Sequence, residues 1–119
     1  TDALKNKNPH KALQLLQNQL DHGEKPRKIL GTIAWQFRVI WEVKHYQQRN
    51  IPSGQIAKAM GANPFVVEKA LQHTKKFSTQ QLRRSYSQLT QADRSLKSTS
   101  QDPVAVMQTL ILGLTANRQ

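Results

Sequence analysis

The stretch that decides the fold is PRKILGTIAWQFRVIWEVKHYQQR, residues 26–49. Proline suits the first turn of a helix because its missing N–H would have no partner there, and no further proline follows until Pro52. On a 3.6-residue period, one face carries Leu30, Ile33, Ala34, Phe37, Ile40 and Trp41, and the opposite face carries Trp35, Val39, Val43 and Tyr46. Because a helix that is apolar on two sides has to be covered on two sides, we predict a central helix about 35 Å long.

Signals for helix starts divide the rest of the chain. They stand at Asn8-Pro9, Ser53, Asn63-Pro64, Ser78 with Gln81, and Asp102-Pro103. Each combines a side chain that can cap backbone N–H groups with a helix-starting proline or a capping box, except Ser53, which is predicted to cap a short helix alone. Strand signals are nearly absent. We therefore predict an all-α fold, a bundle of about six helices around one long central helix.

The helix predicted over residues 78–97 carries an acidic residue within its apolar stripe. The stripe consists of Leu82, Tyr86, Leu89 and Leu96, and Asp93 interrupts it. A buried carboxylate needs a partner. Lys97 lies one turn further on, and Arg38 lies on the central helix, so Asp93, Lys97 and Arg38 form a candidate structural ion pair.

The domain organisation is predicted from the length and from the first helix. At 119 residues, the chain is long enough for one domain with its own core. The helix that ends before Gly23 has a single apolar stripe, so residues 1–25 are predicted as an N-terminal helix that could end a preceding domain. Residues 26–119 are predicted as the main helical domain. The chain starts at Thr1 without an initiator Met, and we expect a fragment of a longer protein.

The composition favours binding over catalysis. The net charge is +11, from 18 Lys and Arg against 7 Asp and Glu, which favours a polyanion or an acidic partner. The four histidines are scattered, and we find no phosphate-binding loop and no metal-ligand cluster. We expect no cofactor and no enzymatic activity. The lack of cysteine favours a reducing cytoplasm, and no apolar run is long enough to cross a membrane.

A helix-turn-helix DNA-binding protein is the alternative interpretation. Ala57, Gly61 and Val67 have the spacing of such a unit, with the glycine in the turn. The helix over residues 64–75 would then read a duplex, and its candidate contacts are Asn63, Lys69 and Gln72.

Several runs resemble one bacterial protein family in order and spacing. They are WQFR (35–38), IAKAMG (56–61), NPFVVEKAL (63–71), KFS (76–78), ADRSLK (92–97) and DP (102–103). Together they resemble the C-terminal part of the bacterial DNA polymerase III delta subunit. The resemblance covers the chain from about Pro9 onward.

The resemblance implies a non-catalytic role in DNA replication. Family members are part of the clamp loader, which loads the sliding clamp on primed DNA for DNA polymerase III. Their third domain is a helical collar that joins the loader subunits. The resemblance therefore implies other clamp-loader subunits as partners, a sliding-clamp contact in an N-terminal domain missing here, and at most weak, non-specific or indirect DNA contact.

Two surfaces are candidates for the interface with other subunits. The last helix is more apolar than docking requires, because Val104 and Leu112 lie outside its main stripe of Val106, Met107, Leu110, Ile111 and Leu114. An exposed apolar patch tends to mark a contact site. The second candidate is the face of the central helix with Trp35, Val39 and Tyr46.

Overall fold

A computed structural model describes residues 2–116 of the chain. These residues form seven α-helices, of which six have eight residues or more, and one 3-10 helix. The helices are α1 (Asp2–Lys5), α2 (Pro9–Asp21), α3 (Pro26–Gln48), α4 (Ser53–Met60), α5 (Pro64–Leu71), the 3-10 helix η1 (Thr74–Lys76), α6 (Thr79–Lys97) and α7 (Pro103–Ala116). The all-α prediction is confirmed.

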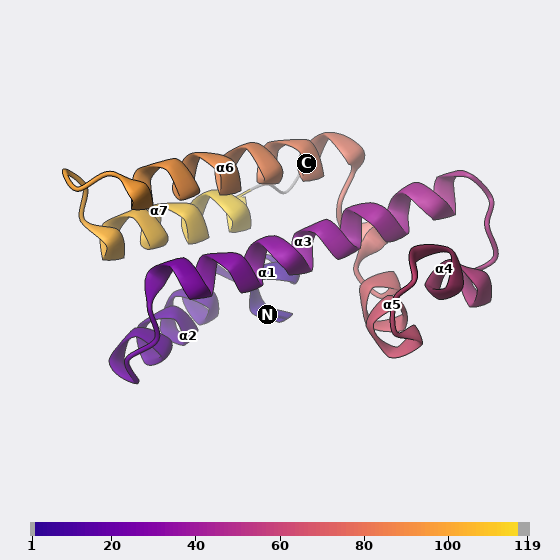
Figure 1. Cartoon of the computed structure of the whole chain (residues 1–119), viewed down its shortest axis with the longest axis horizontal. Helices are drawn as coiled ribbons and strands as arrows, with labels where there is room; N and C mark the ends of the chain where they lie inside the picture. The colour runs from indigo at the N-terminus through magenta and orange to yellow at the C-terminus, as the bar shows by residue number, and fades with distance from the viewer. Residues whose placement is uncertain (1, 117–119) are drawn as a thin grey trace.

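The helix α3 is the axis of the molecule. It runs through a particle of 45 × 28 × 25 Å, with α6 and α7 beside it as an antiparallel pair (Figure 1). The helices α1 and α2 pack against α7, and α4 and α5 pack against the C-terminal half of α3. The prediction of a central helix covered from two sides is therefore confirmed.

The core follows the apolar residues of α3. Buried α3 side chains come from both predicted faces, and they are Ile29, Leu30, Ile33, Phe37, Val39, Ile40 and Val43. Phe37 meets Phe77, a fully buried residue between η1 and α6, with ring centroids 5.7 Å apart in an edge-to-face arrangement. On α6 the small residues Ser85 and Ala92 are buried among leucines, which lets its neighbours approach closely.

Several helix starts are capped as the sequence predicts. The Asn8 side chain accepts a hydrogen bond from the Lys11 backbone N–H, and Asp102 accepts one from Val104. At the start of α6, Ser78 and Gln81 form both bonds of the capping box. These caps fix where the helices begin.

Two local predictions are wrong, and one short helix was missed. Pro52, not Ser53, occupies the N-cap position of α4, and Ser53 is its first helical residue. The helix predicted over 64–75 ends at Leu71, because the Thr74 hydroxyl donates to the Leu71 carbonyl and the chain tightens into η1. The short helix α1 was not predicted, since four residues carry no readable period.

One aromatic residue is also less buried than predicted. Tyr86 is 59% exposed, and it lies beside Trp41, which is partly buried. Their rings meet edge to face, with centroids 5.9 Å apart, at the margin of the contact between α3 and α6. The buried stripe of α6 is Leu82, Ser85, Leu89 and Ala92, which turns Tyr86 outward.

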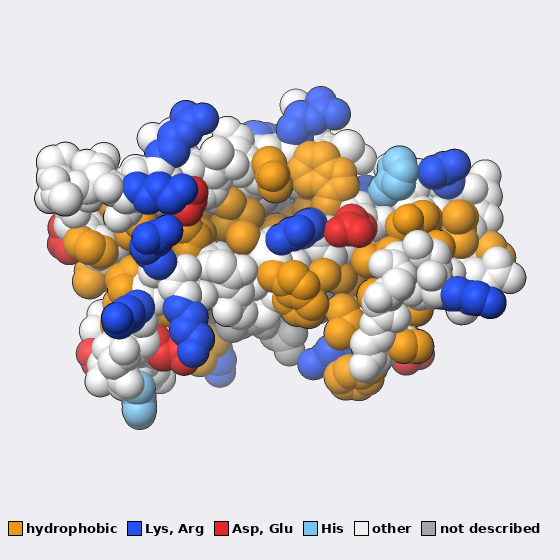
Figure 2. All heavy atoms as spheres, in the orientation of Figure 1, with side chains coloured by type: hydrophobic (Ala, Val, Ile, Leu, Met, Phe, Trp, Pro, Cys, Tyr) orange, Lys and Arg blue, Asp and Glu red, His pale blue; other side chains and the backbone are white. Residues whose placement is uncertain are grey.

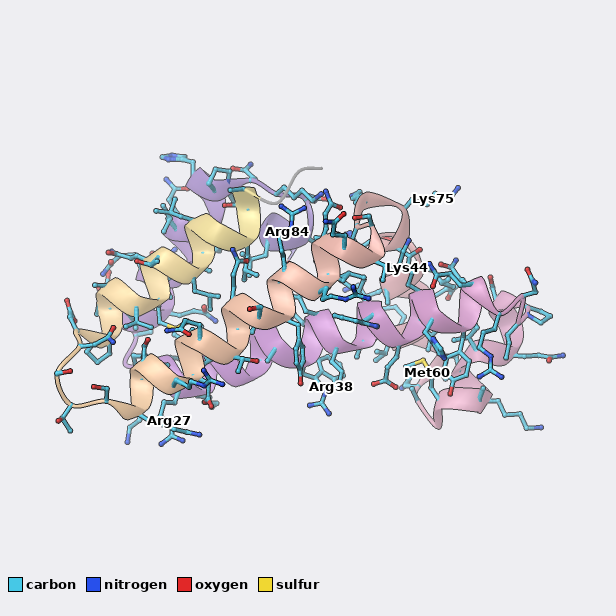
Figure 3. The ribbon with its side chains drawn as sticks, turned by 90° about the horizontal axis from the view of Figure 1, so that it is seen from above. Arg27, Arg38, Lys44, Met60, Lys75 and Arg84 are labelled. Atoms are coloured by element: carbon cyan, nitrogen blue, oxygen red, sulfur yellow. The ribbon has the colours of Figure 1, made fainter. Side chains whose placement is uncertain are left out.

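The loop between α1 and α2 contacts the middle of the chain. The Lys7 ammonium group donates a hydrogen bond of 2.7 Å to the Lys76 carbonyl and lies over the Phe77 ring, 4.7 Å from its centroid. Near the same place, Lys44 of α3 donates to the Thr74 carbonyl at 3.0 Å (Figure 3). The loop before α2 is thereby fastened to the segment that leads into α6.

Candidate subunit interface

The helix α7 carries no charged residue. Its sequence PVAVMQTLILGLTA contains no Asp, Glu, Lys or Arg, although the chain as a whole carries +11. Met107, Leu110, Ile111 and Leu114 are buried against the bundle. Leu112 is 50% exposed, so this large apolar side chain faces outward from an uncharged helix.

A groove of about 410 Å³ lies between α6 and α7. Of the side chains that line it, Asp102 is the one with a formal charge, and the others are small, apolar or amide side chains. Gly113 makes room for the groove wall, because a Cβ atom there would stand 2.8 Å from the Gln88 side-chain nitrogen. Depletion of charge is typical of the centre of a protein–protein interface.

Val104 shares α7 with Leu112 but is less accessible. Its side chain is partly buried, near the start of the helix. Leu112 is therefore the stronger candidate of the two for a contact with another protein.

The second candidate surface, predicted from Trp35, Val39 and Tyr46, is not a single exposed face of the structure. Val39 is buried, and Tyr46 packs partly buried against the core on the side that α4 and α5 cover. Trp35 is 48% exposed and lies on the outer side of α3, three residues before the exposed Arg38. Of these residues, only Trp35 is available to a partner.

The acidic residue on α6 has a local partner. The Lys97 ammonium group lies 3.0 Å from the Asp93 carboxylate, one helical turn away, and both side chains are partly exposed. Within residues 2–116, Asp93 is not paired with Arg38. Asp93 lines a groove together with Arg27 and Leu30 at the start of α3, whereas Arg38 stands further along and points away from the bundle (Figure 3).

The three candidate nucleic-acid contacts lie around α5. The Asn63 side chain is used as a cap and accepts a hydrogen bond of 2.8 Å from the Phe65 N–H. Lys69 lies over the Phe65 ring, 5.4 Å from its centroid, and Gln72 is the exposed C-cap residue. The helix has eight residues and packs on α3 and α4, so it acts as part of the bundle.

Neither a metal site nor a membrane span is found in the part of the chain that the structure describes. Over residues 2–116, no group of three or more His, Cys, Asp or Glu side chains could hold a metal ion. Among the same residues, no helix has both the length and the apolar character needed to cross a bilayer.

Comparison with known proteins gives the family. Residues 1–114 match the model of the family described as DNA polymerase III delta subunit, C-terminal domain. The chain belongs to this family. The family prediction made from the sequence is thereby confirmed, and nothing in the comparisons supports a helix-turn-helix regulator.

Individual relatives agree with this assignment. The chain is 29% identical over 109 residues to the DNA polymerase III subunit delta of Bacillus subtilis (strain 168), a match that covers 92% of this chain and 31% of that protein. The solved structure of a Bacillus subtilis DNA clamp loader delta protein superposes with a TM-score of 0.88 at 28% identity. That match covers 97% of this chain and 34% of the other. The chain thus spans about a third of these relatives.

Proposed function

We propose that this domain joins a delta subunit to the other subunits of a clamp loader and carries no catalytic activity itself. The observation that carries the proposal is the family match over residues 1–114, together with a relative whose structure is described as a clamp loader delta protein. The scattered histidines and few acidic residues of the chain fit a binding role. A place in the cytoplasm, in a complex that serves DNA polymerase III, follows from the same proposal.

The uncharged outer side of α7 is the proposed contact surface. Leu112 supplies an exposed apolar side chain, and the groove between α6 and α7 lies on the same helix. Burying apolar area contributes roughly 25 cal/mol per Å², whereas charged side chains there would have to be desolvated. A helix without charges avoids that cost.

The remaining contacts of the longer protein are proposed to lie elsewhere. The sliding-clamp contact is assigned to a part of the delta subunit outside this chain, and any DNA contact of this domain is weak and independent of sequence. The boundary at residue 25 stays a prediction. Within this chain α2 packs against α7, so residues 9–21 share its core.

The test uses a full-length delta subunit that contains this domain, mixed with the other clamp-loader subunits of the same organism. Hydrogen exchange is measured on delta alone and in the complex. We expect slower exchange within residues 103–116 on assembly. If no peptide within residues 26–116 gains protection, this domain does not join the subunits.

A pair of variants tests the contact itself. Leu112→Glu places a carboxylate in the proposed interface, and Phe65→Glu places one on a side chain that is 64% exposed at the other end of the molecule. Both should keep their helical circular dichroism. We expect Leu112→Glu to stop co-elution with the other subunits and Phe65→Glu to co-elute normally. Normal assembly of Leu112→Glu would rule out α7 as the contact.

A further inference from the structure

A small pocket of about 140 Å³ lies between the C-terminal half of α3 and the first turns of α6. The buried Leu82 and the partly buried Trp41 supply its apolar lining. By contrast with the groove lined by Asp102 and the groove lined by Asp93, this pocket has no carboxylate in its lining. Its other lining side chains are polar or cationic, and they are Lys44, His45, Gln48, Thr79 and Arg83.

The two segments that meet at this pocket are strongly basic. Residues 38–49 of α3 contain three Lys and Arg side chains and one carboxylate, that of Glu42, which does not line the pocket. Residues 75–84, which lead from η1 into α6, contain four Lys and Arg side chains and no acidic residue. Figure 2 shows that Lys and Arg side chains are also more common than Asp and Glu on the face it presents. The local excess of positive charge favours an anion as the occupant of the pocket.

The Lys44 side chain is held in place by the backbone. Its ammonium group donates a hydrogen bond of 3.0 Å to the Thr74 carbonyl, between α3 and the segment that leads into α6 (Figure 3). An ammonium group has three donors, so two of them remain for a ligand. Because this bond already orders the side chain, binding an anion costs Lys44 less conformational entropy than it would cost a free surface lysine.

The Thr79 hydroxyl is also oriented by a neighbour. The Gln48 side-chain nitrogen donates a hydrogen bond of 3.2 Å to Thr79 Oγ1. Since that oxygen accepts from α3, its own O–H is left to donate to a ligand. Arg83 follows one helical turn later on α6 and adds a planar guanidinium group with several donors. The pocket therefore gathers donors of three kinds from two helices.

This set of donors favours a terminal phosphate group over a nucleic-acid backbone. A phosphate monoester carries about −1.5 to −2 charges at pH 7 and three strong acceptor oxygens. A backbone phosphate of DNA carries a single negative charge. An ammonium, a guanidinium and a hydroxyl group around one small space can all be used by a terminal phosphate, whereas a single-charge phosphodiester leaves part of the positive charge unmatched.

We infer that this pocket between α3 and α6 binds the terminal phosphate of a small molecule, with Lys44, Thr79 and Arg83 as its donors. Pyrophosphate and the nucleoside di- and triphosphates share this chemistry. The pocket lies at the start of α6, whereas the groove between α6 and α7 begins at Gln88 and extends to the end of α6. Phosphate binding is therefore a property separate from the proposed contact on α7.

The first test places a carboxylate in the pocket of a full-length delta subunit. Thr79→Glu is compared with Gln80→Glu, because both residues lie in the first turn of α6, where a carboxylate is favourable, and only Thr79 lines the pocket. Isothermal titration calorimetry measures binding of inorganic pyrophosphate. We expect binding at least about tenfold weaker in Thr79→Glu, as loss of hydrogen bonds to a charged group implies, and unchanged binding in Gln80→Glu. Equal binding by the two variants, or no binding by the parent, overturns the inference.

A second pair of variants removes one cation at a time. Arg83→Gln and Arg94→Gln each change an exposed arginine of α6, and only Arg83 lines the pocket. Pyrophosphate binding should weaken in Arg83→Gln and stay unchanged in Arg94→Gln, and this pair decides the matter if Thr79→Glu fails to fold. Hydrogen exchange locates the ligand, because pyrophosphate should slow exchange within residues 41–48 and 79–83. Protection elsewhere in the protein and none in these segments overturns the inference.

Three probes separate the sources of the phosphate. Pyrophosphate tests the phosphate alone, ATP tests a nucleotide, and a fluorescently labelled oligonucleotide tests nucleic acid. Tighter binding of ATP than of pyrophosphate, lost in Thr79→Glu, would identify a nucleotide as the ligand, and equal binding would show that the phosphate alone is recognised. If Thr79→Glu weakens binding of the oligonucleotide while neither small molecule binds, the pocket contacts a nucleic-acid backbone and the inference is wrong.

Discussion

Phe37 and Phe65 show how one residue type takes two roles in this domain. Phe37 is buried in the centre of α3 and meets the ring of Phe77. Phe65 is mostly exposed on α5 beneath the Lys69 ammonium group. The first contributes burial and an edge-to-face contact, and the second contributes little to the free energy of unfolding.

Truncation of Phe37 should therefore leave the domain marginal. Phe37→Ala is expected to lower the free energy of unfolding by about 3–5 kcal/mol, out of a total of about 5–15 kcal/mol. Phe65→Ala should change it by less than about 0.5 kcal/mol, as surface substitutions usually do. Urea unfolding followed by circular dichroism measures both. Equal midpoints for Phe37→Ala and the parent would show that α3 is not the centre of the core.

At the scale of the element, α6 depends on its N-terminus. Its first N–H groups have no partner within the helix, and the Ser78 and Gln81 side chains satisfy two donors reciprocally. Because α6 contacts both α3 and α7, a cap that fixes where it begins also fixes the register of two packing surfaces.

Removal of this cap should have a moderate and local cost. Ser78→Ala is expected to lower the free energy of unfolding by about 0.5–2 kcal/mol. Ser87→Ala, in the exposed interior of the same helix, should leave it unchanged or raise it slightly, because alanine is the better helix former. Thermal unfolding followed by circular dichroism compares the two variants. An equal loss of stability in Ser78→Ala and Ser87→Ala would mean that the capping box contributes nothing to the free energy of unfolding.

Long periodic helices and their caps were predictable, whereas burial at the edges of contacts was not. The bounds of α3 follow from Pro26 and from an unbroken apolar pattern, and those of α6 from its capping box. The exposure of Tyr86 depends on how α6 is rotated against α3, which a single stripe does not determine. The burial of Val39 depends on α4 and α5 folding back onto α3.

A similar limit applies to predicting the candidate subunit interface from the sequence. Leu112 could be found because it lies outside the stripe of its own helix. The groove that Leu30 and Gly31 of α3 form with Leu89 of α6 could not, because these two helices lie far apart in the sequence.

At the scale of the whole molecule, the net charge of +11 predicts that any DNA binding is independent of the base sequence. The Lys and Arg residues are spread over all helices except α7, so phosphate contacts should dominate and no base sequence should be preferred. Fluorescence anisotropy with two unrelated duplexes should give similar affinities that fall steeply between 50 and 200 mM salt, a range over which phosphate-dominated binding loses roughly 10³-fold or more. A strong preference for one duplex, lost in Lys69→Ala or Gln72→Ala, would instead favour base reading by α5.

The contact between Lys7 and the segment before α6 has a consequence for the rate of unfolding. The helices α3, α4 and α5 follow one another along the chain, but Lys7 and Lys76 are 69 residues apart, and α2 packs against α7 at the far end of the chain. Closing such long loops costs chain entropy before the contacts form. We therefore expect the contact of Lys7 with Lys76 and the packing of α2 on α7 to form late in folding. Weakening the contacts of Lys7 with the Lys76 carbonyl and the Phe77 ring should then speed unfolding while leaving the folding rate nearly unchanged. The segment before α2 would then be the first part of the domain to detach.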